Sequence, residues 1–109
     1  MNHGYEAFRD DLIERMSADA VHYPEIYWAA KEHFPDLSDH ERLELIVRAI
    51  AELVDGNTAK VGLLEDAGGV LDVTPWPERG ADLRLRIQAD VQACPIPPRL
   101  GDGFWISTP

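Results

Sequence analysis

The segment from Ser38 to Gly56 constrains the fold more than any other part of the chain. Ser38 and Glu41 have the spacing of a capping box, in which each side chain bonds a backbone N–H at the start of a helix. Gly56 suits the left-handed position just past a helix end. Between them, apolar residues recur at spacings that predict a broad buried face over three turns: Leu43, Ile46, Val47, Ile50, Leu53 and Val54. We therefore expect a central helix here.

Two further helices are predicted before this one. The first covers Tyr5 to Met16, because Tyr5, Phe8, Leu12 and Met16 form one apolar stripe at helical spacing. The second begins at Pro24, since proline is well tolerated at the first helical position. Pro35 ends it, because the residue before a proline avoids the helical conformation.

The pattern changes after Asn57. Lys60–Glu65 and Val70–Thr74 are short β-prone runs separated by a glycine-containing loop, which predicts a β-hairpin. A fourth helix follows, with one apolar face formed by Leu83, Ile87, Val91 and Cys94. The aromatic and β-branched run Phe104–Ser107 predicts a final strand beside the hairpin.

This order predicts a single α+β domain over residues 1–109, with a helical part (1–57) and a second part (58–109) of hairpin, helix and terminal strand. A chain of 109 residues fits one domain, and a hydrophobic content of 45% is enough for a core. A three-helix N-terminal part followed by a hairpin, a fourth helix and a short C-terminal strand is winged-helix-like, with a C-terminal extension.

The stretch FPDLSDHERLELIVRAIAELVDGNTAKVGL, the proline-flanked Trp76 and the ending FWISTP resemble small uncharacterised actinobacterial proteins. Those proteins share a leucine-rich helix followed by a hairpin, and they end in an aromatic pair followed by TP. The resemblance covers residues 34–109 and implies the same order of elements. It implies nothing about chemistry.

The charge of the chain is strongly negative and unevenly placed. Twenty acidic and ten basic side chains give a net charge of −10, and all of this excess lies in residues 1–75. Because a nucleic-acid duplex is itself a dense polyanion, this charge disfavours nucleic acid as a partner. It is compatible with a protein partner that has a basic surface. Excess acid also keeps a small protein soluble, which is the simpler explanation.

Aromatic residues around the second helix supply a candidate partner-binding surface. Tyr23, Tyr27 and Trp28 cluster there, followed by Glu32 and Asp36. Tyr and Trp are enriched in interface hot spots, although they also fill small cores. Tyr27 can follow the apolar side of the helix, which leaves Trp28 facing elsewhere. We expect a small acidic protein with an inhibitor, immunity or accessory role; homodimerisation through the second helix or the terminal strand is a further option.

The alternative is a winged-helix DNA-binding transcriptional regulator. It would need a basic strip formed by Arg42, Arg48 and Lys60, since phosphate contacts are made by Lys and Arg. Acid outnumbers base on the outward face of the central helix, and Glu65 and Asp66 lie where a DNA-contacting wing would carry a cation. DNA binding is therefore the weaker hypothesis.

No pattern in the sequence predicts catalysis, a cofactor or a metal. His22, His33 and His40 lack the regular spacing of zinc ligands, and the acidic pairs fit a solvated surface. Cys94 lies on an apolar helix face, which predicts a thiol of ordinary reactivity. We expect no enzymatic activity.

The expected compartment is the cytoplasm. A single cysteine excludes an internal disulfide and suits a reducing environment. The first residues lack the order of a secretory signal, and no apolar run approaches the ~18 residues of a membrane-spanning helix.

Overall fold

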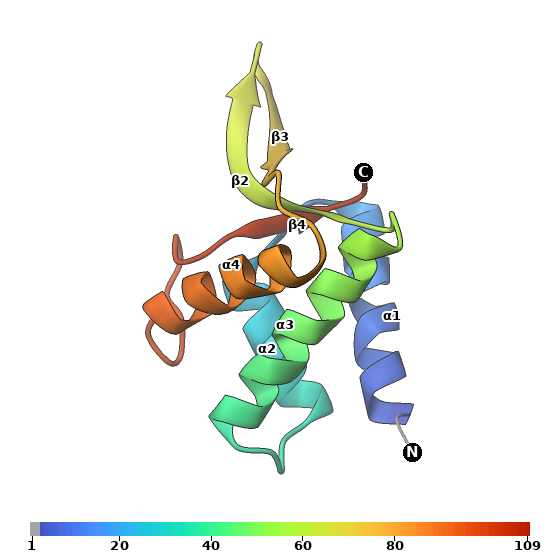
Figure 1. Cartoon of the computed structure of the whole chain (residues 1–109), viewed down its shortest axis with the longest axis vertical. Helices are drawn as coiled ribbons and strands as arrows, with labels where there is room; N and C mark the ends of the chain where they lie inside the picture. The colour runs from blue at the N-terminus through green and yellow to red at the C-terminus, as the bar shows by residue number, and fades with distance from the viewer. Residues whose placement is uncertain (1–2) are drawn as a thin grey trace.

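A computed structural model describes residues 3–109 and confirms the predicted α+β class and order of elements (Figure 1). Helix α3 lies between α1 and α4, with α2 behind it. None of the helices in this described range is long and apolar enough to cross a membrane. The helices are α1 (His3–Ala18), α2 (Tyr23–His33), α3 (Asp39–Asp55) and α4 (Gly80–Ala93), and the strands are β1 (Val21–His22), β2 (Lys60–Ala67), β3 (Val70–Pro75) and β4 (Trp105–Ser107).

The predicted capping box starts α3. Ser38 Oγ accepts a hydrogen bond from the Glu41 N–H at 3.2 Å, and the Glu41 carboxylate accepts one from the Ser38 N–H at 3.1 Å. The expectation for the other end of this helix is wrong. Gly56 has a φ of −84°, and it is Asn57 that takes the left-handed conformation, with a φ of 59°. Asparagine is among the few residues besides glycine that tolerate this region.

The C-terminal strand β4 lies inside the sheet, whose order is β1-β4-β2-β3. Ile106 pairs with Val21 on one side and with Val61 on the other, and all three side chains are buried. The pairing of β4 with the hairpin confirms the predicted final strand, but the two-residue strand β1 was not predicted. Because both edges of β4 are occupied, this strand is not free to pair with a second copy of the chain.

The core lies between the helices and the inner part of the sheet. Ile46 and Ile50 of α3 are fully buried, as is the Phe104 ring just before β4. The Phe104 ring lies 5.3 Å from the Tyr23 ring and 5.8 Å from the Trp76 ring, measured between centroids. This contact joins α2, the end of β3 and β4, so the terminal residues complete the core.

The hairpin β2–β3 extends beyond this core as a projecting ribbon (Figure 1). Its strands are longer than the sequence indicated, because only Gly68 and Gly69 separate Ala67 from Val70. Both glycines have positive φ, 66° and 89°, as a tight hairpin turn of this length requires. At the base of the ribbon, Gly62 lies against the backbone of β3, and a Cβ atom there would clash with the carbonyl oxygen of Thr74.

We predict that Gly62→Ala destabilises the fold by about 3 kcal/mol, because an added methyl group would force the two strands apart. Urea unfolding followed by circular dichroism measures the loss. Gly56→Ala is the matched control, since a Cβ atom there would lie no closer than 3.3 Å to the Glu52 carbonyl oxygen and the φ suits alanine. Equal stability of the two variants would contradict the close approach at Gly62.

Candidate functional site

The aromatic cluster of α2 divides between core and surface. The side chains of Tyr23 and Tyr27 are 0% and 2% exposed, whereas Trp28 is 46% exposed. Burial raises the pKa of the Tyr23 hydroxyl, which has no hydrogen-bond partner among the described residues. Neither tyrosine ring is accessible to a partner, which leaves Trp28, Glu32 and Asp36 of the predicted surface available for contact.

The environment of Trp28 is mixed in charge. Lys31 Nζ lies 5.4 Å from the centre of its ring, and the Tyr27 ring meets it edge-on. Glu32 is one helical turn further along, on the same face of α2, and Asp36 is exposed in the turn that follows. The surface therefore consists of an exposed indole with Lys31 beside its ring and of two exposed carboxylates further along the chain.

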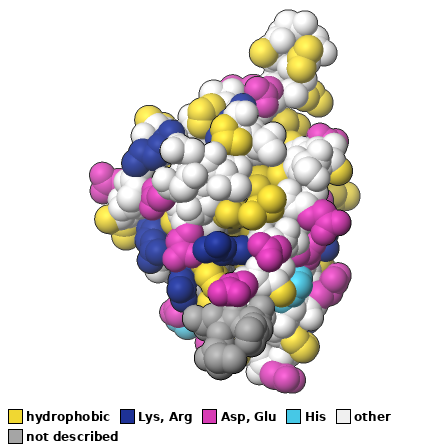
Figure 2. Space-filling view, turned by 90° about the vertical axis from the view of Figure 1, so that its right-hand side faces the viewer, with side chains coloured by type: hydrophobic (Ala, Val, Ile, Leu, Met, Phe, Trp, Pro, Cys, Tyr) yellow, Lys and Arg dark blue, Asp and Glu magenta, His cyan; other side chains and the backbone are white. Residues whose placement is uncertain are grey.

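The hairpin carries the second exposed apolar surface. Its outer part exposes Leu63, Val70 and Leu71 by 53%, 66% and 66%. Hydrophobic side chains are visible on the projecting end of the molecule in Figure 2. Sequence reasoning assigned these residues to strands but did not identify them as a surface. The signal was the adjacent pair Val70 and Leu71, because neighbouring residues of a strand face opposite sides and one core cannot bury both.

Carboxylates surround these apolar side chains. Glu65 and Asp72 are direct cross-strand partners, an arrangement of like charges that is unfavourable unless a cation offsets it. Lys60 supplies that cation, with its Nζ 3.0 Å from Asp72 Oδ2. Hydrogen bonds from Lys60 and from the Val73 N–H lower the pKa of Asp72. Asp66, also exposed, accepts a hydrogen bond from the Gly69 N–H in the turn at 2.7 Å. This part of the molecule, residues 63–72, is called here the hairpin surface. The strand register places Leu63, Glu65, Val70 and Asp72 on one of its faces and Asp66 and Leu71 on the other.

Arg42, the first residue of the predicted basic strip, has a structural role. Its side chain is buried, and its guanidinium donates hydrogen bonds to the Phe34 carbonyl at 2.9 Å and to the Leu37 carbonyl. It also pairs with Asp39 at 2.7 Å. Arg42 thereby holds the turn between α2 and α3, and it presents no charge to a duplex.

The other two cations of that strip are also engaged. Arg48 Nε donates to Glu52 at 3.3 Å, and the guanidinium lies 4.4 Å from the centre of the Tyr5 ring. Lys60 pairs with Asp72 on the hairpin, as described above. Each of the three residues therefore has a carboxylate partner, so they do not form a free basic strip.

Tyr5, Arg9, Arg48 and Glu52 form a polar cluster between α1 and α3, around a hollow of about 380 Å³. The Tyr5 hydroxyl and Arg9 Nη1 both donate to Glu52 Oε1, the latter at 3.2 Å. Burial and the bond to Glu52 raise the pKa of Tyr5 to about 12. Hydrogen bonds from Tyr5, Arg48 and Arg9 lower the pKa of Glu52, against a smaller opposing effect of burial. The shared Glu52 carboxylate thus ties α1 to α3.

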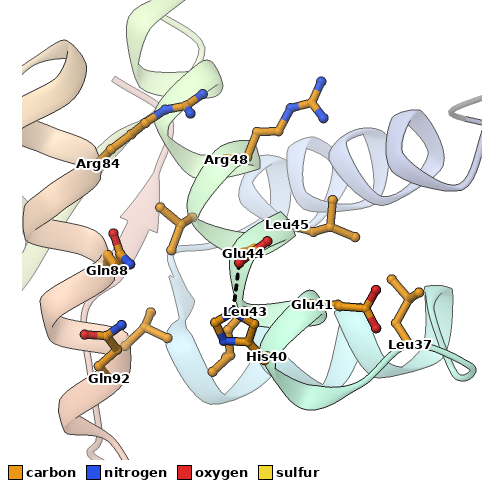
Figure 3. Close-up of a pocket in the computed structure, with 12 residues that line it drawn as sticks. Leu37, His40, Glu41, Leu43, Glu44, Leu45, Arg48, Arg84, Gln88 and Gln92 are labelled. Carbon is orange, nitrogen blue, oxygen red and sulfur yellow. Dashed lines mark ion pairs between the residues drawn. The ribbon is translucent and has the colours of Figure 1, made fainter.

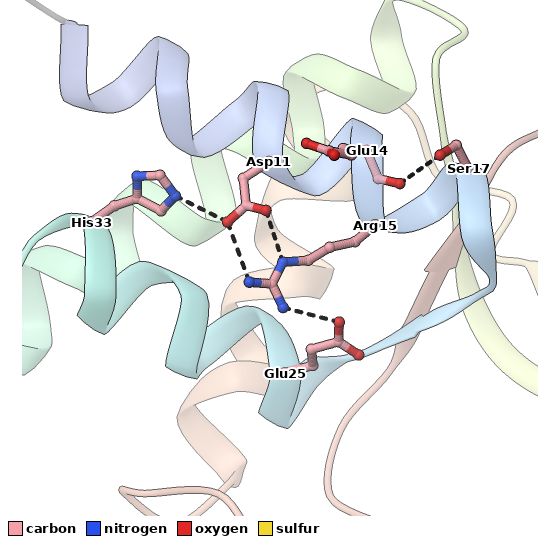
Figure 4. Close-up of polar contacts among 6 residues, drawn as sticks. All are labelled: Asp11, Glu14, Arg15, Ser17, Glu25 and His33. Atoms are coloured by element: carbon pink, nitrogen blue, oxygen red, sulfur yellow. Dashed lines mark hydrogen bonds and ion pairs between the residues drawn. The ribbon is translucent and has the colours of Figure 1, made fainter.

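The histidines lie in separate places. His33 Nε2 is 2.9 Å from Asp11, whose other partner is Arg15, and Arg15 reaches on to Glu25 (Figure 4). Burial acts to raise the pKa of Asp11, but the hydrogen bonds from Arg15 and His33 outweigh it and lower the pKa.

His22 is stacked on Trp105 with ring centroids 4.2 Å apart, and burial lowers its pKa. His40 pairs with Glu44 one helical turn along α3. Within the described part of the chain, no three His, Cys, Asp or Glu side chains come together in a group able to hold a metal ion.

Cys94 is half-buried at the end of α4. Its thiol donates to the Asp90 carbonyl at 3.3 Å, and burial raises its pKa. Because the thiolate is the reactive form, a raised pKa keeps this group a poor nucleophile at neutral pH.

Comparison with protein-family models, with curated proteins and with solved structures finds no match to this chain. Function is therefore inferred from the geometry and charge of the chain itself.

We predict that Glu52→Gln lowers the free energy of unfolding by about 1 kcal/mol near neutral pH, because three donors lose a charged acceptor. The folded-state pKa of Glu52 lies below its ordinary value of 4.5. Its contribution is therefore present above that value and is lost as the pH falls through the folded pKa. Urea unfolding at neutral and strongly acidic pH measures the change.

Glu32→Gln is the control, because it removes an exposed carboxylate of α2. It should leave the free energy of unfolding unchanged. A Glu52→Gln defect that persists unchanged in strong acid would contradict the assignment of this stability to the carboxylate.

Proposed function

We propose that this chain is a small acidic, non-enzymatic protein that binds another protein, in an inhibitor, immunity or accessory role. The observation that carries the proposal is the projecting hairpin surface, on which Leu63, Val70 and Leu71 are exposed among carboxylates. Exposed apolar side chains gathered on one projecting element are characteristic of interaction sites, whereas single scattered ones need no explanation.

The charge of the hairpin surface indicates the chemistry of the partner. Glu65 and Asp66 are exposed at its outer end, and the nearby cation Lys60 is already paired with Asp72. A partner with a basic surface would pair with Glu65 while its apolar groups cover Val70, which lies on the same face of the hairpin. A second copy of the chain would instead bring two such acidic surfaces together, so a different, basic protein fits better.

The surface of Trp28, Glu32 and Asp36 is proposed as a second contact region. A large, half-exposed indole is a typical interface anchor, since it buries much area at a small cost in side-chain entropy. A cytoplasmic location is part of the same proposal and rests on the single, unpaired cysteine. The alternative of a DNA-binding regulator is supported by the order of elements only.

Affinity capture from a lysate of the encoding organism tests the proposal, with Val70→Ser as the decisive variant. We expect the wild type to retain a basic protein that high salt releases, and we expect Val70→Ser to retain at least about tenfold less of it. Leu100→Ser is the matched control, because Leu100 is 94% exposed but lies outside the hairpin surface. Trp28→Ala tests the second region in the same way.

Thermal melting should be nearly unchanged in all three variants, since each replaced side chain is substantially exposed. Retention of the same proteins by the wild type and by Val70→Ser would contradict a role for the hairpin surface. Failure of the wild type to retain any specific protein would contradict the proposed function as a whole.

A further inference from the structure

A groove separates α3 from α4, away from both proposed protein-binding surfaces (Figure 3). It is open to solvent and has a volume of about 570 Å³, within the size range of small-molecule sites. Its floor is apolar and is formed by the half-buried Leu43 and Val47 of α3 and the buried Val91 of α4. Such a floor favours the apolar part of a ligand.

The two rims of the groove are polar, and each repeats at the spacing of one helical turn. His40, Glu44 and Arg48 line the α3 side. Arg84, Gln88 and Gln92 line the α4 side. In Figure 3, Arg48 and Arg84 lie at one end of the groove, and His40 and Gln92 lie at the other. The eight steps from His40 to Arg48 rise about 12 Å along the helix, which sets the length of the groove.

Arg48 and Arg84, which lie at the same end of the groove, differ in their partners. Arg48 is held by Glu52 and by the Tyr5 ring, as described above. Arg84 is exposed, and in the described part of the chain no carboxylate or carbonyl oxygen bonds its guanidinium. Its guanidinium is therefore available to an anion at the mouth of the groove.

We propose that the α3–α4 groove binds a small amphipathic monocarboxylate, with the apolar chain on Leu43, Val47 and Val91 and the carboxylate on the Arg84 guanidinium. A guanidinium fits a carboxylate with two parallel hydrogen bonds, and the Gln88 amide can donate a further one. A single negative charge fits best, because the net charge of −10 repels ligands that carry more. The inference does not depend on the proposed protein partner, since neither Trp28 nor the hairpin surface lines the groove.

A titration with sodium decanoate tests the proposed carboxylate site. The ligand is added to the whole protein below its micelle concentration, and binding is followed by amide chemical shifts in NMR spectra. We expect saturable shifts at Leu43, Val47 and Val91. Arg84→Gln should weaken binding about tenfold, the effect of losing one charge-assisted hydrogen bond. Arg99→Gln is the control with the same change of charge at an exposed site outside the groove, and it should bind within about twofold of the wild type.

Decyltrimethylammonium is the chain-matched ligand of opposite charge. Weaker binding of this cation in the groove supports the role of Arg84. The proposal is overturned if both head groups bind equally well, if Arg84→Gln leaves the affinity for decanoate unchanged, or if the shifts map to the hairpin surface instead of the groove.

Discussion

The position of β4 between β1 and β2 is the constraint on which the rest of the structure depends. Without it, the two-residue strand β1 and the hairpin would have no hydrogen-bonded connection, since no other strand lies between them. The strand also brings Phe104 into the core, where its ring meets those of Tyr23 and Trp76. The last residues of the chain thus join the helices to the base of the hairpin. The outer part of the hairpin is left free of the core, and that is where its apolar side chains are exposed.

The elements defined by local signals could be predicted from the sequence. The capping box of Ser38 and Glu41 and the apolar period behind it located α3, and the glycines at 68 and 69 located the turn of the hairpin. These features depend on residues only a few positions apart, so a single sequence contains them. The exchange of roles between Gly56 and Asn57 was missed because both residues tolerate the left-handed conformation.

The features that depend on long-range packing could not be predicted. Strand β1 exists only because Val21 pairs with Ile106, eighty-five positions away in the chain. Tyr23 and Tyr27 could equally have been surface anchors or core residues, and only their contacts with Phe104 and Asp39 place them inside. The burial of Arg42 could not be predicted either. Its guanidinium is surrounded by backbone carbonyl groups of the preceding turn, and an arginine near a helix start does not by itself indicate such contacts.

The pairing of charges supports the proposal of a protein partner over a nucleic-acid duplex. A winged-helix reader needs free cations along its central helix, yet Arg42 is buried against carbonyl oxygens and Arg48 is held by Glu52. Lys60 is paired with Asp72 at the base of a hairpin whose outer end is acidic. Releasing these cations to a duplex would break internal ion pairs and leave their carboxylates facing phosphate. The same carboxylates would attract a basic protein surface.

The most direct test of this account is titration of labelled duplex DNA with the protein, followed by fluorescence anisotropy at about 50 mM and about 200 mM salt. The account predicts no saturable binding at micromolar protein at either concentration, because Arg42, Arg48 and Lys60 are each paired with a carboxylate and do not form a cationic strip that could displace the counterions of the duplex. A saturable complex at the lower salt concentration that weakens steeply at the higher one would contradict it.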